Sequence, residues 1–176
     1  MLVSETTAGQ ENEKVPVNSV PIDKTPADVG FNFTKPKRKV TKIFLHCSDN
    51  SNPKWGIPEL QILHNQNTNG DGIQYHYFID RAGKIHNTRE LERHPIMAQE
   101  NNNTNSIAIC VHGGQHGNDF KDIQMKQLQS LCKAINEAYN GIPFRGHCEV
   151  SKKGKACPVF DYKSVLKLNG KGYINR

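Results

Sequence analysis

Short β-prone runs alternate with segments of helical periodicity along most of this chain, and that alternation limits it to a few folds. The run at 40–46 and the run S-I-A-I-C-V-H-G-G at 106–114 are typical of buried strands. Residues 73–88 predict a β-hairpin that turns through D-R-A-G, where Gly83 is free to take a positive φ. Strands interleaved with helices predict an α/β (α+β) fold, a single domain with a central mixed β-sheet flanked by helices.

Three helices are expected in addition to these strands. The first begins near Pro58, carries Leu60, Leu63 and His64 on one side, and ends in N-T-N-G-D-G. The last starts at Asp161, a good N-cap, and runs through Val165 and Leu168. The middle helix has the best periodicity and stops at Asn140-Gly141; its apolar positions are Leu128, Leu131, Cys132, Ile135 and Tyr139.

Two further expectations concern the middle of the chain. Strand alternation in the hairpin should send Tyr75, Tyr77 and Ile79 to one face and His76, Phe78 and Asp80 to the other. Residues 89–105 are polar and end in an asparagine-rich run, which predicts a long irregular surface loop.

The N-terminal part differs in composition from the rest. Residues 1–38 carry scattered prolines and no sustained periodicity, so we expect a flexible N-terminal arm followed by one catalytic domain at 39–176. Phe31 and Phe33 are candidates for docking this arm onto the domain. The basic cluster formed by Lys35, Lys37, Arg38 and Lys39 is interpreted as a solvated linker end.

Charge and cysteine content narrow the class of protein. A formal net charge of +6 suits a polyanionic partner such as nucleic acid, teichoic acid or peptidoglycan. Because the lysines are spread out, no nucleic-acid partner is expected. Five cysteines without a C-x-x-C pair indicate folding under reducing conditions. The sequence predicts no signal peptide and no membrane span, hence a protein made soluble in a cytoplasm.

A reactive segment lies near the C-terminus, in G-H-C-E-V-S-K-K-G-K-A-C-P-V-F-D at 146–161. It carries His147 and Cys157, and His46 ends the first strand. Two imidazoles and one thiolate, with a fourth position left to water, match a catalytic zinc site. Cys47 and Cys148 each follow a ligand and are expected to point away. His64, His76 and His112 are interpreted as structural, and His86, His94 and His116 as surface residues.

Six ordered segments resemble the zinc-dependent N-acetylmuramoyl-L-alanine amidases, a family that includes small phage lysozyme-type amidases and animal peptidoglycan recognition proteins. They are K-I-F-L-H-C-S, I-Q-Y-H-Y-F-I-D-R-A-G-K-I, N-S-I-A-I-C-V-H-G-G, the Q-M-K-Q-L helix, G-H-C-E-V and K-A-C-P-V-F-D. The resemblance covers about residues 39–170. It implies that His46, His147 and Cys157 bind Zn²⁺ and that Tyr75 and Lys155 are catalytic.

The function implied is hydrolysis of the amide bond between the lactyl group of N-acetylmuramic acid and L-alanine in bacterial peptidoglycan. Zinc-activated water would attack, while Lys155 and Tyr75 stabilise the oxyanion. Tyr75, Lys155 and Glu149 all stay candidates for protonating the departing amine. The family's histidine beside the substrate groove is absent, and His94 is its nearest substitute.

The biological setting that this resemblance implies is a monomeric phage endolysin, held in the host cytoplasm until it is released to the cell wall. A virion-carried wall enzyme is the alternative. A recognition module that binds peptidoglycan without cutting it is another, although such relatives lack the cysteine ligand.

Overall fold

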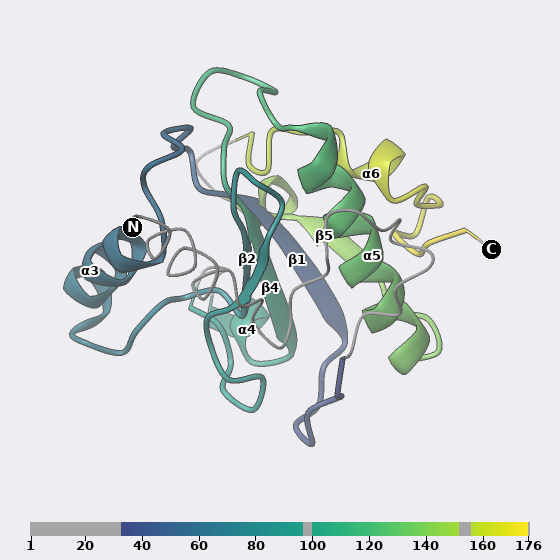
Figure 1. Ribbon diagram of the computed structural model, residues 1–176. Helices are drawn as coiled ribbons and strands as arrows, with labels where there is room; N and C mark the ends of the chain where they lie inside the picture. Colours follow the sequence, from purple (N-terminus) through teal and green to yellow (C-terminus); the bar gives the residue numbers. More distant parts are fainter. Residues whose placement is uncertain (1–32, 97–99, 152–155, 176) are drawn as a thin grey trace, which may run out of the picture.

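A computed structural model describes residues 33–96, 100–151 and 156–175 of the protein. Its centre is a five-stranded sheet with the strand order β3-β2-β4-β1-β5 (Figure 1). Four strands are mutually parallel, and β3 pairs antiparallel with β2 at one edge. The mixed central sheet predicted from the sequence is therefore confirmed. The strands are β1 (Lys42–Cys47), β2 (Tyr77–Ile79), β3 (Ile85–Asn87), β4 (Ser106–Val111) and β5 (Phe144–Gly146).

Helices cover both faces of this sheet. Helix α3 (Ile57–Thr68) lies on one side, and α5 (Asp122–Ala138) and α6 (Tyr162–Val165) lie on the other (Figure 1). Two short elements complete the fold: α4 (Glu100–Asn103) precedes β4, and the 3₁₀ helix η1 (His147–Glu149) follows β5. The result is three layers with two apolar clusters, one under each helical layer.

Helix α5 forms as its periodicity predicts. Leu128, Leu131, Cys132 and Ile135 are fully buried against the sheet. The Gln124 side chain accepts a hydrogen bond from the Lys121 N–H at 2.9 Å and so caps the helix start. The chain then leaves the helix at Asn140 and Gly141, both of which have a positive φ, as the stop signal predicted.

Helix α3 contacts the sheet through a narrower stripe than expected. Leu60 and His64, one turn apart, are buried, but Leu63 is 44% exposed and Ile62 is 61% exposed. The expectation that Leu63 shares the buried side is therefore wrong, because only the i, i+4 row of this helix faces the sheet.

The hairpin forms with the expected turn, and Gly83 has a φ of 89°. A Cβ on Gly83 would lie 2.6 Å from Cγ1 of Ile123, so packing also requires glycine here. The predicted alternation is wrong at Tyr75, which packs with Phe78 on the α3 side, whereas Tyr77 lies in the cluster under α5. The reason is that β2 begins only at Tyr77, and the chain bends before it.

Two other expectations need correction. The segment 89–105 is not irregular throughout, because it contains α4, and the buried Arg89 anchors its start by donating to the Ile73 carbonyl at 3.0 Å. Helix α6 is capped by Asp161 as expected, but it ends at Val165 rather than running through Leu168. The left-handed conformation of Lys167 turns the chain there, and Leu168 instead bridges to Ile174.

Residues 33–38 contact the domain. The Phe33 ring packs against the Tyr139 ring with centroids 6.1 Å apart. Arg38 donates to the Leu91 carbonyl and to the Ser106 carbonyl, so this member of the basic cluster is bonded into the domain rather than solvated. Phe31 and the rest of the predicted arm lie outside the described residues, and the boundary at 38/39 stays a prediction.

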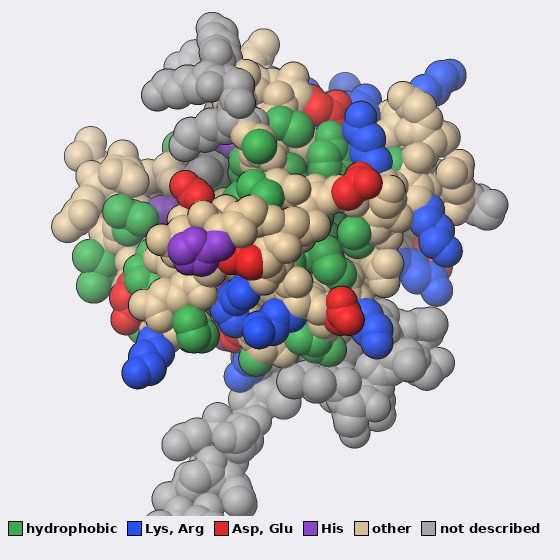
Figure 2. All heavy atoms as spheres, turned by 90° about the horizontal axis from the view of Figure 1, so that it is seen from above, with side chains coloured by type: hydrophobic (Ala, Val, Ile, Leu, Met, Phe, Trp, Pro, Cys, Tyr) green, Lys and Arg blue, Asp and Glu red, His purple; other side chains and the backbone are tan. Residues whose placement is uncertain are grey.

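The surface is charged and mixed. On the face seen in Figure 2, Lys and Arg side chains are interspersed with Asp and Glu. Among the described residues, no helix combines the length and the apolar character that a membrane crossing requires.

Replacing Leu131 by alanine should lower the free energy of unfolding by about 2–5 kcal/mol, because the side chain is fully buried and its loss leaves a cavity. Urea denaturation measures this. Ile62→Ala is the matched control, since that side chain is 61% exposed, and its effect should stay within about 0.5 kcal/mol. Equal losses in the two variants would contradict the assignment of the core.

Candidate active site

His46 is the penultimate residue of β1 and is 1% exposed. Neither of its ring nitrogens has a hydrogen-bond partner among the described residues, although both are buried. Burial, with a smaller contribution from neighbouring His147, holds the pKa of His46 well below its ordinary value. A buried polar group without a partner costs free energy, and a neutral imidazole is the form that binds metals.

His147 comes to His46 through the sheet. Because β1 and β5 are parallel neighbours with Leu45 paired to Gly146, the residues that follow this pair reach the same edge together. The two imidazole centroids are 4.8 Å apart. Gly146 is required at the turn into η1, because a Cβ there would lie 2.6 Å from the Tyr162 ring.

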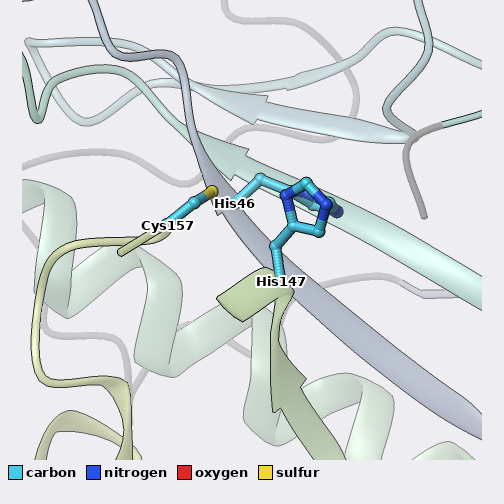
Figure 3. Close-up of side chains that lie close together, drawn as sticks. All are labelled: His46, His147 and Cys157. Atoms are coloured by element: carbon cyan, nitrogen blue, oxygen red, sulfur yellow. The ribbon is translucent and has the colours of Figure 1, made fainter. Parts of the chain in front are cut away.

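Cys157 approaches from the loop that precedes α6. Its carbonyl accepts from the Cys148 N–H at 2.7 Å, and its Sγ accepts from the Cys47 N–H at 3.2 Å. One potential ligand atom from each of His46, His147 and Cys157 lies within 4.8 Å of the other two. Figure 3 shows the three side chains converging from β1, from the start of η1 and from this loop.

These residues border a cavity of about 370 Å³. Its wall includes Tyr75, whose ring centroid is 5.5 Å from that of His46. Burial and the neighbouring Cys110 thiol raise the pKa of Tyr75 well above its ordinary value, so the hydroxyl keeps its proton and can donate a hydrogen bond. The cavity thus combines three potential metal ligands with one buried hydroxyl donor.

Sequence reasoning missed two residues of this cavity, Ser48 and Asp49. Asp49 has a φ of 57°, and its N–H donates to the Gly113 carbonyl at 3.0 Å. The Ser48 hydroxyl lies 2.7 Å from Nδ1 of His112, which is buried as the structural interpretation predicted. The turn-forming S-D-N at 48–50, which begins two residues after His46, was the available signal.

Other candidate residues lie elsewhere. Lys155 falls outside the described residues, so its role stays a prediction. Glu149 is not among the residues that line the cavity, and its carboxylate accepts from the Gly146 N–H at 2.9 Å and from the Tyr162 hydroxyl. These contacts favour Tyr75 and Lys155 over Glu149 as the group that protonates the amine, and that assignment stays a prediction.

The two neighbouring cysteines behave differently. Cys148 is exposed and lies outside the ligand group. Cys47 is also outside that group, but it borders the cavity and its thiol is hydrogen-bonded to that of Cys157. The expectation that the Cys47 side chain points away from the site is therefore wrong. Its exclusion from the three potential ligands agrees with the structure. This thiol contact, followed by burial, raises the pKa of Cys157.

A larger groove of about 640 Å³ lies between α5 and the C-terminal segment. Its wall consists of Lys, Asn, Gln, Glu and aliphatic side chains, with no histidine or cysteine among the described residues. Size alone would favour this groove as the active site. The smaller cavity is the better candidate, because it carries the three potential metal ligands.

The chain also matches a known family. A family model described as N-acetylmuramoyl-L-alanine amidase matches residues 36–160. No curated protein matches the chain. Solved structures also share the fold, among them the three that follow, and their sequence identities are too low to show more than the fold.

The first is the endolysin N-acetylmuramoyl-L-alanine amidase LysCS from Clostridium intestinale URNW, which is 21% identical with a TM-score of 0.64 over 77% of this chain and 90% of that one. The second is the Ph2119 endolysin from the Thermus scotoductus MAT2119 bacteriophage Ph2119, at 21% identity and a TM-score of 0.63 over 90% and 93%. The third is the Drosophila peptidoglycan recognition protein SD, at 18% identity and a TM-score of 0.61 over 90% and 96%. Because the family model spans most of the chain, the protein belongs to the N-acetylmuramoyl-L-alanine amidase family.

Proposed function

We propose that this amidase is zinc-dependent, and that it cleaves the bond between the lactyl group of N-acetylmuramic acid and L-alanine through His46, His147 and Cys157 as zinc ligands. The observation that carries the proposal is the clustering of their ligand atoms within 4.8 Å at the cavity wall. The two unpartnered ring nitrogens of His46 support it, because a bound cation would satisfy one of them. Three protein ligands leave one position for water, as in catalytic rather than structural zinc sites.

When bound, zinc supplies Lewis acidity that makes water a competent nucleophile near neutral pH. His46 is ready to ligate, since burial keeps its imidazole neutral. Cys157 has to lose a proton first, because its thiol contact and burial raise its pKa. Metal binding at this site should therefore release a proton.

Tyr75 would act on the substrate side of the site. Tyr75 lines the cavity and its hydroxyl keeps its proton, so we propose that it donates a hydrogen bond to the amide oxygen as that oxygen becomes negative. We propose that Lys155 adds positive charge at the same oxygen, and that Tyr75 or Lys155 returns a proton to the departing amine. The substrate is bacterial peptidoglycan, and the enzyme acts as a monomer.

The likeness in fold to two endolysins supports a phage setting. We propose an endolysin that is held in the host cytoplasm and reaches the wall when the membrane is opened. Expression in a host should then cause lysis only when a membrane-permeabilising agent is added. Lysis without that agent would contradict the cytoplasmic storage.

Chelation of metal should stop amide cleavage, and added zinc should restore it. The measurement is the release of new L-alanine amino termini from purified peptidoglycan, by wild type before chelation, after chelation and after zinc is returned. Binding to the wall without any release would replace the amidase proposal with a recognition role. Undiminished release by the metal-free protein would contradict the zinc site alone.

A further inference from the structure

The Tyr75 ring packs against two histidines. Its ring centroid is 5.5 Å from that of His46 and 5.2 Å from that of His64. His46 belongs to the candidate zinc site, but His64 comes from helix α3 and does not line the cavity. His64 is nevertheless only 4% exposed, so the fold buries a polar ring against the candidate catalytic tyrosine.

The segment that carries Tyr75 departs from regular strand geometry. A regular continuation of β2 would offer the Ala108 N–H a backbone carbonyl. Instead, the Ala108 N–H donates to Nδ1 of His76 at 3.1 Å. The Tyr75 carbonyl accepts from the Thr88 hydroxyl at 2.7 Å rather than from β4. This irregularity brings Tyr75 to the sheet face that carries Phe78.

His64 is hydrogen-bonded to Gln74, the residue that precedes Tyr75. Its Nδ1 accepts a hydrogen bond from the Gln74 N–H at 2.9 Å. Burial lowers the pKa of His64 to about 4, so the ring is neutral near pH 7 and its Nδ1 can accept. The contact joins α3 to the segment immediately before Tyr75, and the same imidazole packs against the phenol ring.

We propose that His64 is a positioning residue for catalysis, which holds Tyr75 in its place at the cavity wall through the Gln74 backbone contact and the ring packing. This rests on the proposed catalytic role of Tyr75. His64 is not a member of the ligand group and does not line the cavity, so we expect its effect on the reaction to run through Tyr75. A displacement of about 1 Å in a catalytic group is enough to cost on the order of 100-fold in rate.

The test compares His64→Phe, which keeps a ring but loses the acceptor, with His64→Asn, whose Oδ1 occupies the place of Nδ1. His64→Phe should keep wild-type zinc content and lower kcat by about 10- to 100-fold with little change in KM. His64→Asn should recover part of that loss, because it can accept from Gln74. His116→Phe, at an exposed histidine, is the control and should leave kcat unchanged.

A double-mutant cycle with Tyr75→Phe shows whether the effect runs through the hydroxyl. In the Tyr75→Phe background, His64→Phe should cause no further loss of kcat. An equal loss in both backgrounds would overturn the proposal, and so would wild-type kcat in Tyr75→Phe. If His64→Phe does not fold, His64→Asn is compared with His64→Ala, and equal kcat values would overturn it.

Failure of the proposed function is distinguishable from these results. Wild-type protein that releases no L-alanine amino termini would contradict the amidase proposal before any variant is made. Zinc-dependent cleavage with additive effects of His64 and Tyr75 would leave the amidase proposal intact and remove only the positioning role.

Discussion

Cys157→Ser is expected to remove zinc from the protein and to lower kcat/KM for amide hydrolysis by at least about 10³-fold. Within the part of the chain that the structure describes, the thiol belongs to a group of three potential ligands whose atoms lie within 4.8 Å of one another. A serine hydroxyl keeps its proton and is not among the usual zinc ligands. A Lewis acid contributes several kcal/mol to the transition state, and each 1.4 kcal/mol corresponds to about tenfold in rate. Zinc per chain and the release of L-alanine amino termini are measured on the same samples.

The matched control is Cys148→Ser. Cys148 follows His147, and its N–H contacts the Cys157 carbonyl, but its side chain is exposed and lies outside the ligand group. This variant should keep its zinc and stay within about twofold of wild-type activity, because substitutions of exposed side chains outside the site usually have small effects. Loss of zinc in both variants, or in neither, would contradict the assignment of Cys157.

The sequence predicted those parts of the site that depend on neighbouring residues in the chain, but not those that depend on pairing between distant segments. His46 follows a plainly apolar run, and His147 follows a short one, so both could be placed near strand ends from the sequence. Their meeting depends on the parallel pairing of β1 with β5, which joins segments about a hundred residues apart in the chain. The zinc role of these residues stays a prediction, because spacing along the chain cannot fix a ligand set.

The errors arose where side chains replaced backbone partners. Strict alternation would put Tyr75 with Tyr77, but the His76 imidazole takes the Ala108 N–H and the chain bends before β2. Glu149 shows a contact that the sequence also did not reveal. It was one of three candidates for protonating the amine, and its carboxylate accepts from the Gly146 N–H at the start of η1. Neither contact has a periodicity that a sequence pattern could reveal.

Acidification from pH 6.5 to 4.5 should lower the unfolding free energy of the metal-free protein by about 4 kcal/mol. Burial lowers the pKa of His64 to about 4 and that of His76 to about 3, and it also holds the pKa values of His46 and His112 below 6.5. At pH values between the folded and unfolded pKa of a histidine, that histidine is protonated in the unfolded chain and neutral in the folded chain. Stability is therefore complete above about pH 6.5 and is lost as the pH falls.

The upper limit is about 1.4 kcal/mol per pH unit for each histidine. We expect well under half of it, because the backbone carbonyls that contact the His76 and His112 rings favour their protonated forms and oppose the effect of burial. The carboxylates whose pKa values the fold lowers from 3.8, including Asp71, Asp80 and Asp119, lose their stabilising effect mainly below this window. Urea unfolding at several pH values measures the slope. His64→Phe should flatten it because one titrating ring is gone, whereas His116→Ala, at an exposed histidine, should not. A slope that is unchanged in His64→Phe would mean that the buried ring takes up its proton without unfolding. That result would also remove the neutral acceptor on which the Gln74 contact depends at acidic pH.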